Sequence, residues 1–257
     1  MSLNATNLSV SAGGQRVLEE IDFTLDPGQI VAVLGPNGAG KSSLLRAMSN
    51  EWQAAAGQVQ LHNEALIHWD ARQRATTLAV LPQRTHLNFD FTVAEVVRLG
   101  RTPHASGQQH DTMIASAALA RVDGIGLAER LYTELSGGEQ QRVQLARVLA
   151  QIWEPSEYGA RMILLDEPAA AFDLAHQELL IDILQQLGRD GVGVLVVLHD
   201  LNLAARVAHT MMLLKGGRMV AFGPPAEIVQ PALIAEVFDV EVSVTSHPRT
   251  GTPLAIL

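Results

Sequence analysis

The stretch "GPNGAGKS", from Gly35 to Ser42, decides the fold of this chain. It fits the pattern G-x-x-x-x-G-K-S, follows an apolar segment that predicts a buried strand, and precedes a predicted helix from about Lys41 to Ser49. Successive backbone N–H groups in such a loop form a nest for an anion, and the helix N-terminus adds its positive end. Lys41 would carry charge to the β- and γ-phosphates of a nucleotide, and the Ser42 hydroxyl would be a ligand of Mg²⁺. The predicted phosphate-binding residues are Gly35, Pro36, Asn37, Gly38, Ala39, Gly40, Lys41, Ser42 and Ser43.

The composition indicates a globular chain. Of its 257 residues, 47% are apolar and 18% are charged, which suits one large α/β domain or a core with a small subdomain. The formal charge of −9 argues against sequence-independent binding of nucleic acid, which needs a basic face. The lack of cysteine excludes disulfides, thiolate metal sites and cysteine nucleophiles. We expect a cytoplasmic chain, because the start lacks a secretory signal and the densest apolar run, Val192 to Leu198, is far too short to span a membrane.

Patterns of apolar residues predict an α/β fold. Near-continuous apolar segments predict the buried strands of a parallel sheet that helices cover on both faces, at 30–34, 78–83, 161–168 and 193–200. "GQVQLHN" predicts another short strand, and alternating residues around Gly13-Gly14 and Gly216-Gly217 predict two antiparallel hairpins. From 87 to 152 the sequence has helical spacing and no strand candidate. We therefore predict a helical subdomain over 87–152, inserted into a core made of residues 1–86 and 153–257.

Polar side chains follow three of the predicted strands. In "MILLDEP", Asp166 and Glu167 stand at the carboxyl end of a buried strand, where open α/β sheets bind ligands. Asp166 is suited to hold Mg²⁺, and Glu167 is suited to polarise an attacking water as general base. Gln83 could reach the metal and that water, and His199 could touch the γ-phosphate and the water. Each of these residues alone has an ordinary structural explanation, and only their combination with the glycine loop favours catalysis.

"ELSGGEQQR", from Glu134 to Arg142, looks like a second anion cradle without a lysine. Ser136, Gly137 and Gly138 provide a helix N-cap and two residues that let backbone N–H groups approach a ligand. Taken alone, the stretch is more simply explained as a capped helix with a glycine entry turn.

In this order, the segments resemble an ATP-binding-cassette ATPase, and the resemblance covers essentially the whole chain. The matching motifs are the Walker A (Gly35–Ser42), Q-loop (Gln83), signature (Leu135–Glu139), Walker B (Ile163–Asp166) followed by Glu167, D-loop (Ala170–Asp173) and switch histidine (His199). The resemblance implies a P-loop NTPase (RecA-like) core, an antiparallel β subdomain and an inserted α-helical subdomain. It also implies hydrolysis of ATP with Mg²⁺, the metal held by Ser42, Gln83 and Asp166.

The resemblance gives the signature stretch a role in a second copy of the chain. Cassettes of this family work as head-to-tail dimers with two ATP molecules between them. Ser136 and Gly138 would bind the γ-phosphate of ATP held on Lys41 of the partner subunit, and Asp173 would link the two sites. Hydrolysis through Glu167 and His199 would release the dimer.

Two positions depart from the family pattern. An aromatic residue usually precedes the Walker A and stacks on adenine, whereas this chain has "SVSAGG" there, so we expect only apolar contact from Val10, Ala12 or Val17. The D-loop carries Phe172 where leucine is common.

Further segments resemble importer cassettes. "FTVAEVVRLGRTPH" is similar to the segment after the Q-loop in importers of iron-siderophores, cobalamin and haem. The insertion Gln151–Arg161, the segment 172–177 and the tail 247–257 are similar to haem-import ATP-binding subunits. The implied partners are a second copy, a permease dimer that docks near Gln83 to His104, and a periplasmic haem-binding protein, at the cytoplasmic face of the bacterial inner membrane. The alternatives are a siderophore or cobalamin importer and a regulatory cassette outside transport. His104, His176 and His247 are not expected to bind haem, because the cargo crosses through the permease.

Overall fold

The computed structural model describes residues 1–83 and 89–257. Its centre is a six-stranded sheet with the strand order β10-β9-β3-β8-β7-β6. Neighbouring strands from β9 to β6 run parallel, and β10 pairs antiparallel with β9 at one edge. The strands are β3 (Ile30–Leu34), β6 (Leu78–Leu81), β7 (Met162–Asp166), β8 (Gly193–Val197), β9 (Thr210–Lys215) and β10 (Arg218–Gly223). The predicted parallel sheet and the hairpin at Gly216-Gly217 are confirmed.

A second sheet is antiparallel and has the order β2-β1-β4-β5. Its strands are β1 (Leu3–Ala12), β2 (Gln15–Leu25), β4 (Ala56–Leu61) and β5 (Glu64–Ala65). The predicted turn at Gly13-Gly14 is confirmed, and both glycines have positive φ angles, 57° and 78°, which a tight hairpin turn requires. Of these elements, the sequence reasoning missed β5.

The two faces of the central sheet build separate hydrophobic cores. In β3 the side chains alternate, so that Ile30, Ala32 and Leu34 join one core while Val31 and Val33 join the other. The second core contains residues of helix α1 (Lys41–Met48) and of the antiparallel sheet, and the first contains residues of most of the other helices. Because both faces are buried, the central strands read as continuous apolar runs.

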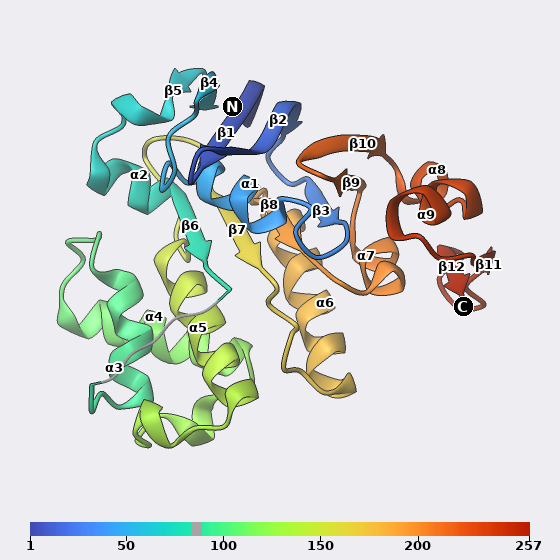
Figure 1. Cartoon of the computed structure of the whole chain (residues 1–257). Coiled ribbons are helices and arrows are strands. Elements are labelled where there is room, and N and C mark those ends of the chain that lie inside the picture. The colour runs from blue at the N-terminus through green and yellow to red at the C-terminus, as the bar shows by residue number, and fades with distance from the viewer. Residues whose placement is uncertain (84–88) are drawn as a thin grey trace.

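The remaining helices surround this framework, as Figure 1 shows. They are α2 (Ala71–Thr77), α3 (Val93–Arg98), α4 (Gln108–Arg121), α5 (Gly137–Gln151), α6 (Leu174–Arg189), α7 (Leu201–Val207), α8 (Pro225–Ile228) and α9 (Pro231–Phe238). Short 3-10 turns occupy Leu66–His68, Leu99–Arg101, Ile125–Leu127 and Tyr132–Glu134, and the chain ends with the hairpin β11 (Ser243–Ser246) and β12 (Pro253–Ile256). In the described part of the chain, no helix has the length and apolar character to cross a membrane.

Helices α3, α4 and α5 lie together at the lower left of Figure 1, away from the antiparallel sheet. Among the described residues from 89 to 152 there are helices and turns but no named strand, in agreement with the predicted helical spacing. The expected start of the helical subdomain, at 87, lies outside the described residues. The division into core and helical subdomain stays a prediction.

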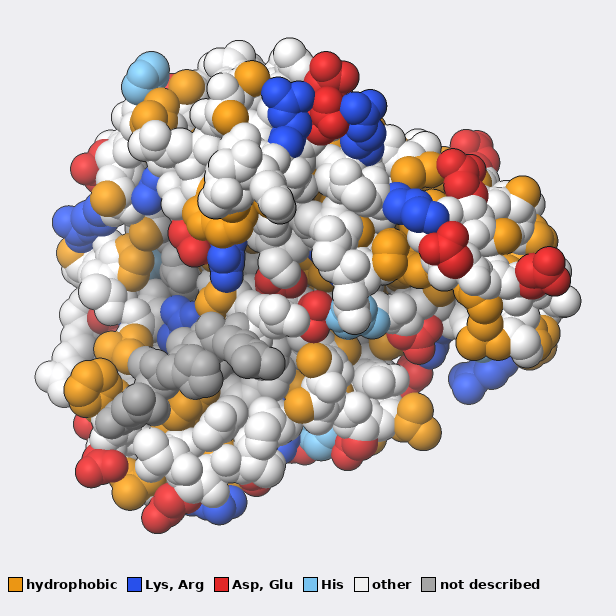
Figure 2. All heavy atoms as spheres, viewed as in Figure 1, with side chains coloured by type: hydrophobic (Ala, Val, Ile, Leu, Met, Phe, Trp, Pro, Cys, Tyr) orange, Lys and Arg blue, Asp and Glu red, His pale blue; other side chains and the backbone are white. Residues whose placement is uncertain are grey.

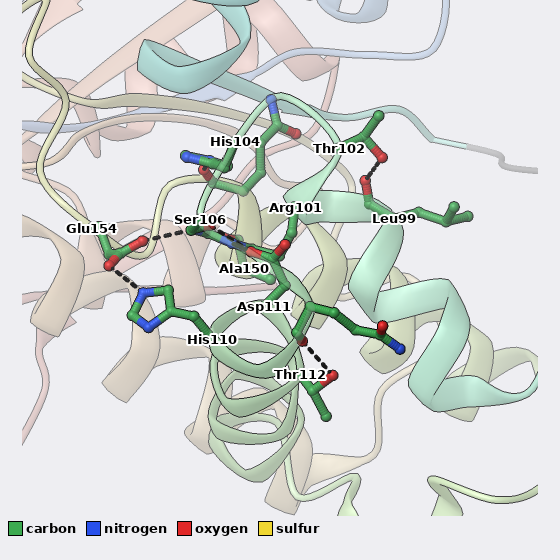
Figure 3. Close-up of polar contacts among 12 residues, drawn as sticks. Leu99, Arg101, Thr102, His104, Ser106, His110, Asp111, Thr112, Ala150 and Glu154 are labelled. Atoms are coloured by element: carbon green, nitrogen blue, oxygen red, sulfur yellow. Dashed lines mark hydrogen bonds and ion pairs between the residues drawn. The ribbon is translucent and has the colours of Figure 1, made fainter.

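A buried arginine ties the inserted segment after α5 to this helical region (Figure 3). The side chain of Arg101 is 1% exposed and lies 3.1 Å from Asp111 and 2.6 Å from Glu154. Its Nη1 also donates to the carbonyl of Ala150. Glu154 in turn lies 2.7 Å from His110 of α4. Ion pairs of Glu154 therefore anchor the inserted segment 151–161 to the helical region.

Candidate nucleotide site

The glycine loop runs from the end of β3 into α1, as predicted, and its backbone accepts only glycine at key points. Gly35 has a φ of +154°, and a Cβ there would lie 2.1 Å from the carbonyl oxygen of Leu214. Gly40, at φ +102°, would bring a Cβ to 2.9 Å from the carbonyl oxygen of Val17. The neighbouring strands thus press against the loop and hold it in shape. The loop leads directly into the N-terminus of α1, and a glycine loop before a helix N-terminus is suited to bind phosphate.

Lys41 is buried at the base of this loop. Its Nζ donates to the carbonyl oxygens of Gly35 at 2.7 Å and Pro36 at 3.0 Å, so the ammonium is held over the loop. Burial lowers the pKa of Lys41, while the nearby carboxylates of Glu167 and Asp166 act in the opposite direction. The position suits a point charge that meets the phosphates of a nucleotide.

Asp166 ends β7 beside Ser42 and is only 5% exposed. Burial, with the charge of Glu167 adding to it, raises the pKa of Asp166 despite a hydrogen bond from Ser42. Among the described residues, Asp166 Oδ1 has no hydrogen-bond partner. A buried carboxylate oxygen without a partner, next to a hydroxyl, fits a hard divalent cation, so the residues present fit Mg²⁺.

Glu167 and His199, 32 positions apart in the chain (199 − 167), come together at the ends of adjacent strands. His199 Nε2 lies 2.6 Å from Glu167 Oε1. Glu167 is one of the few residues other than glycine with a positive φ, +52°, which is a costly conformation for a side chain of this size. Strain of this kind is typical of functional sites, where the structure must aim a side chain. The pair can hold and pass a proton at the end of the sheet.

A hollow of about 560 Å³ lies at this site, and Lys41, Ser42 and Glu167 line it, whereas Asp166 and His199 are not among its lining residues. It is lined by Gln15, Arg16, Val17, Asn37, Gly38, Ala39, Gly40, Lys41, Ser42, Ser43, Gln83, Glu167, Gly216 and Gly217. The structure therefore brings most of the predicted loop together with Gln83 and Glu167. The sequence reasoning predicted the turn at Gly216-Gly217 but did not place it, or Gln15 and Arg16, at the site. Local sequence carries no signal for them, because they reach the hollow through pairing of distant strands.

Val10, Ala12 and Val17, which the sequence suggested for apolar contact with the base, differ in whether they line the hollow. Val17 lines the hollow, whereas Val10 is 0% exposed inside the core and Ala12 is not among the lining residues. Of the three, Val17 alone is placed to touch a ligand in this hollow.

The signature stretch forms a helix N-cap, the simpler explanation considered for it. Ser136 caps α5: its Oγ accepts from the backbone N–H of Glu139 at 3.4 Å, and Glu139 Oε2 accepts from the backbone N–H of Ser136 at 2.8 Å. Ser136 and Gly137 are exposed, and neither they nor Gly138 line the hollow. Within one chain the cap and the glycine loop are thus separate sites.

Asp173 also acts as a helix cap. Its Oδ1 accepts from the backbone N–H of His176 at 2.9 Å and lies 2.7 Å from His176 Nδ1, at the exposed start of α6. The role of Asp173 between two sites stays a prediction, as do the roles of the other site residues.

A glycine loop between a parallel strand and a helix, with a carboxylate pair at the end of a nearby strand, defines an ATPase domain of the P-loop class. Residues 18–170 match the family described as ABC transporter, and the chain belongs to that family. The Hemin import ATP-binding protein HmuV of Myxococcus xanthus (strain DK1622) is 49% identical over 258 residues, covering 100% of this chain and 97% of the relative. The protein of the same name from Pseudomonas entomophila (strain L48) is 50% identical, covering 99% of each chain.

Solved structures agree with the assignment and confirm the predicted fold class. An ABC transporter in an inward-facing conformation has a TM-score of 0.81 at 26% identity, covering 99% of this chain and 96% of that chain. A bacterial ABC transporter cassette solved as a dimer has a TM-score of 0.77 at 26% identity, covering 86% of this chain and 98% of that chain.

Proposed function

We propose that this chain is the ATP-hydrolysing subunit that energises import of hemin across the bacterial inner membrane. The observation that carries the activity is the Glu167–His199 contact of 2.6 Å beside the hollow that also contains Lys41 and Ser42. The cargo is supported by relatives named for hemin import that match along the full length of the chain.

In the proposed reaction the protein holds the triphosphate and directs one water molecule. The loop N–H groups and Lys41 bind the phosphates. Ser42, Asp166 and Gln83 would hold Mg²⁺, which when bound neutralises part of the phosphate charge. Glu167 orients the attacking water and accepts its proton, and His199 supports the carboxylate and the γ-phosphate. The 2.6 Å contact lets the imidazole hold the Glu167 carboxylate in place while the carboxylate accepts that proton.

A second copy of the chain completes the site in this proposal. Ser136, Gly137 and Gly138 contribute a helix N-terminus to the γ-phosphate of ATP on Lys41 of the partner subunit, and Asp173 connects the two sites. Exposure of Ser136 and Asp173 in the single chain supports this role, because both side chains are accessible to another molecule. A bacterial cassette similar to this chain, solved in a post-hydrolysis state with ADP and Pi, is also dimeric.

An importer of hemin also needs a permease and a periplasmic binding protein as partners of this subunit. The dimer docks beneath a permease dimer at the cytoplasmic face of the membrane, near Gln83 to His104, and a periplasmic haem-binding protein supplies the permease. His104 and His176 have partners within the protein, at 2.7 Å from the carbonyl oxygen of Gln151 and 2.7 Å from Asp173, which supports the view that neither binds haem. On the face shown in Figure 2, acidic and basic side chains lie interspersed, an arrangement that does not favour nucleic acid as partner.

The test is reconstitution of the subunit with its permease and binding protein in lipid vesicles. We expect binding protein loaded with hemin to raise the ATPase rate several-fold above the rate with unloaded binding protein. Stimulation by a siderophore or cobalamin complex instead of hemin would support the alternative cargo. Absence of any coupling to a permease would favour a regulatory cassette.

A further inference from the structure

The hollow contains a second group of lining residues in addition to the phosphate loop and the catalytic side chains. Gln15, Arg16 and Val17 come from the start of β2, and Gly216 and Gly217 come from the turn between β9 and β10. Both segments pack directly on the loop. The N–H of Gly217 donates to the carbonyl oxygen of Ala39 at 3.0 Å, and a Cβ on Gly40 would lie 2.9 Å from Val17 O.

The residues of these two segments are lining residues to which the proposed reaction assigns no role. Lys41, Ser42 and Glu167 account for the phosphates and the reacting water. The base, which must lie farther along the same hollow, meets the residues that remain. None of those residues is aromatic, so the usual stacking of a base on an aromatic ring is not offered by the described lining.

Arg16 provides a planar charged group at this point. Its Nη1 lies 3.0 Å from Glu19 Oε1, and the other oxygen of Glu19 lies 2.7 Å from Arg218 Nη2. Glu19 is itself fixed, because its backbone N–H donates to the carbonyl oxygen of Gly217 at 2.9 Å. One edge of the Arg16 guanidinium is therefore anchored, while the side chain remains 57% exposed. A guanidinium held by its edge keeps its faces for stacking on an aromatic ring system.

We propose that the base of the nucleotide stacks on the guanidinium of Arg16 and contacts the methyl groups of Val17. The inference rests on the proposed function, since it assumes that the loop binds a nucleoside triphosphate. It adds the residue that holds the base, and it predicts that nucleotides with different bases bind with similar affinity. Every base has a π-face, and nothing in this pair of contacts distinguishes adenine from guanine.

The test compares ATP with inorganic tripolyphosphate, which carries phosphates but no base, by calorimetry on the full chain. Arg16→Ala should weaken ATP binding about 3- to 10-fold and change tripolyphosphate binding less than about 2-fold. Arg218→Ala is the matched control: it removes the other arginine paired with Glu19, outside the hollow, and should change neither ligand by more than about 2-fold. Arg16→Tyr should restore ATP binding to within about 2-fold of the parent chain. The parent chain should bind GTP within about 3-fold of ATP.

Three results would overturn the inference. ATP binding unchanged in Arg16→Ala would show that the base lies elsewhere. Equal weakening of ATP and tripolyphosphate would show that Arg16 acts on phosphate. Discrimination between ATP and GTP above about 10-fold in the parent chain would require polar contacts that Arg16 and Val17 do not offer. Failure of the proposed function looks different: neither ligand would bind the parent chain, or Lys41→Ala would leave both affinities unchanged.

Discussion

At the scale of single residues, the site combines strain and uncompensated charge. Glu167 has a left-handed backbone at φ +52° and a contact of 2.6 Å with His199. Asp166 beside it is buried with an unpaired oxygen among the described residues. The left-handed backbone of Glu167 and the unpaired buried oxygen of Asp166 each cost stability in the folded chain, and both are accounted for if the site has to hold a cation and a reacting water.

Glu167→Gln should separate binding from chemistry. The amide keeps the size of the side chain but cannot accept a proton from water, so we expect ATP to bind within about 3-fold of the parent affinity while turnover falls about 100-fold or more. Steady-state phosphate release and calorimetry measure the two effects. Glu178→Gln, in an ion pair with Arg206 on the surface, is the control and should retain turnover. Near-normal hydrolysis by Glu167→Gln would remove Glu167 as the base.

Asp166→Asn should stabilise the chain in the absence of nucleotide and metal. Burial raises the pKa of Asp166, so the folded state binds this proton more tightly than the unfolded state. The stabilising contribution is present below the unfolded pKa and is lost as pH rises through the folded pKa. At neutral pH the variant should therefore be more stable by about 1 kcal/mol, and the gain should disappear in acid.

Urea unfolding from neutral to acid pH checks this expectation. The exposed Asp182→Asn should show no such gain at any pH. If Asp166→Asn is less stable than the parent chain at neutral pH, the carboxylate stabilises the fold by itself, and its unpaired oxygen is not a cost that a bound cation has to offset.

At the scale of elements, two helices carry the same cap in different settings. Ser136 with Glu139 caps α5, and Thr92 with Glu95 caps α3, each as a reciprocal capping box. Local sequence accounts for both caps equally well. Only the exposed position and the two following glycines distinguish the cap on α5.

This pair gives an internal control for the proposed signature role. Ser136→Ala and Thr92→Ala should each lower stability by about 1 kcal/mol, because each removes one cap. ATP hydrolysis should fall about 10-fold or more in Ser136→Ala and less than about 2-fold in Thr92→Ala. In addition, Ser136→Arg should leave ATP binding to the loop intact and abolish the ATP-dependent dimer, as measured by light scattering. Equal ATPase rates in the two alanine variants would show that Ser136 is only a cap.

At the scale of the whole molecule, a charge cluster around a buried arginine joins segments that are far apart in the sequence. Arg101, with a side chain 1% exposed, pairs with Asp111 on α4 and with Glu154 after α5. Burial, which favours the neutral form of Asp111, is outweighed by hydrogen bonds from Ser106 and Arg101, so the pKa of Asp111 is lowered. Burial of Glu154 is outweighed in the same way by hydrogen bonds from His110 and Arg101, which lower the pKa of Glu154, so both acids pair with the arginine as carboxylates and Glu154 ties the inserted segment to the helices.

Arg101→Ala should destabilise the chain by about 1 to 3 kcal/mol, because it removes charge-assisted hydrogen bonds to two partly exposed acids and leaves the carbonyl oxygen of Ala150 without this donor. Arg130→Ala removes an exposed ion pair with Glu139, at 3.5 Å, and should cost less than about 1 kcal/mol. Urea unfolding monitored by circular dichroism measures both values. A loss in Arg101→Ala no larger than that in Arg130→Ala would mean that the inserted segment is held by packing alone.

The sequence by itself determined the loop, the buried strands, the hairpins at Gly13-Gly14 and Gly216-Gly217, and the cap at Ser136. Each of these depends on local chemistry: glycine at strained backbone angles, continuous apolar runs, and a hydroxyl three residues before a glutamate. Resemblance to a family extended this to ATP, a dimer and an importer. Ser136 was correctly recognised as a cap, and its role in a second copy stays a prediction.

The tertiary structure decided which side chains meet. It placed His199 against Glu167, Arg101 against Glu154, and Arg16 with Gly217 beside the loop. It also buried Val10, which sequence reasoning had considered for contact with the base. The physical reason is that such contacts join segments brought together by sheet pairing and core packing. Their energy depends on burial and distance, neither of which local sequence contains.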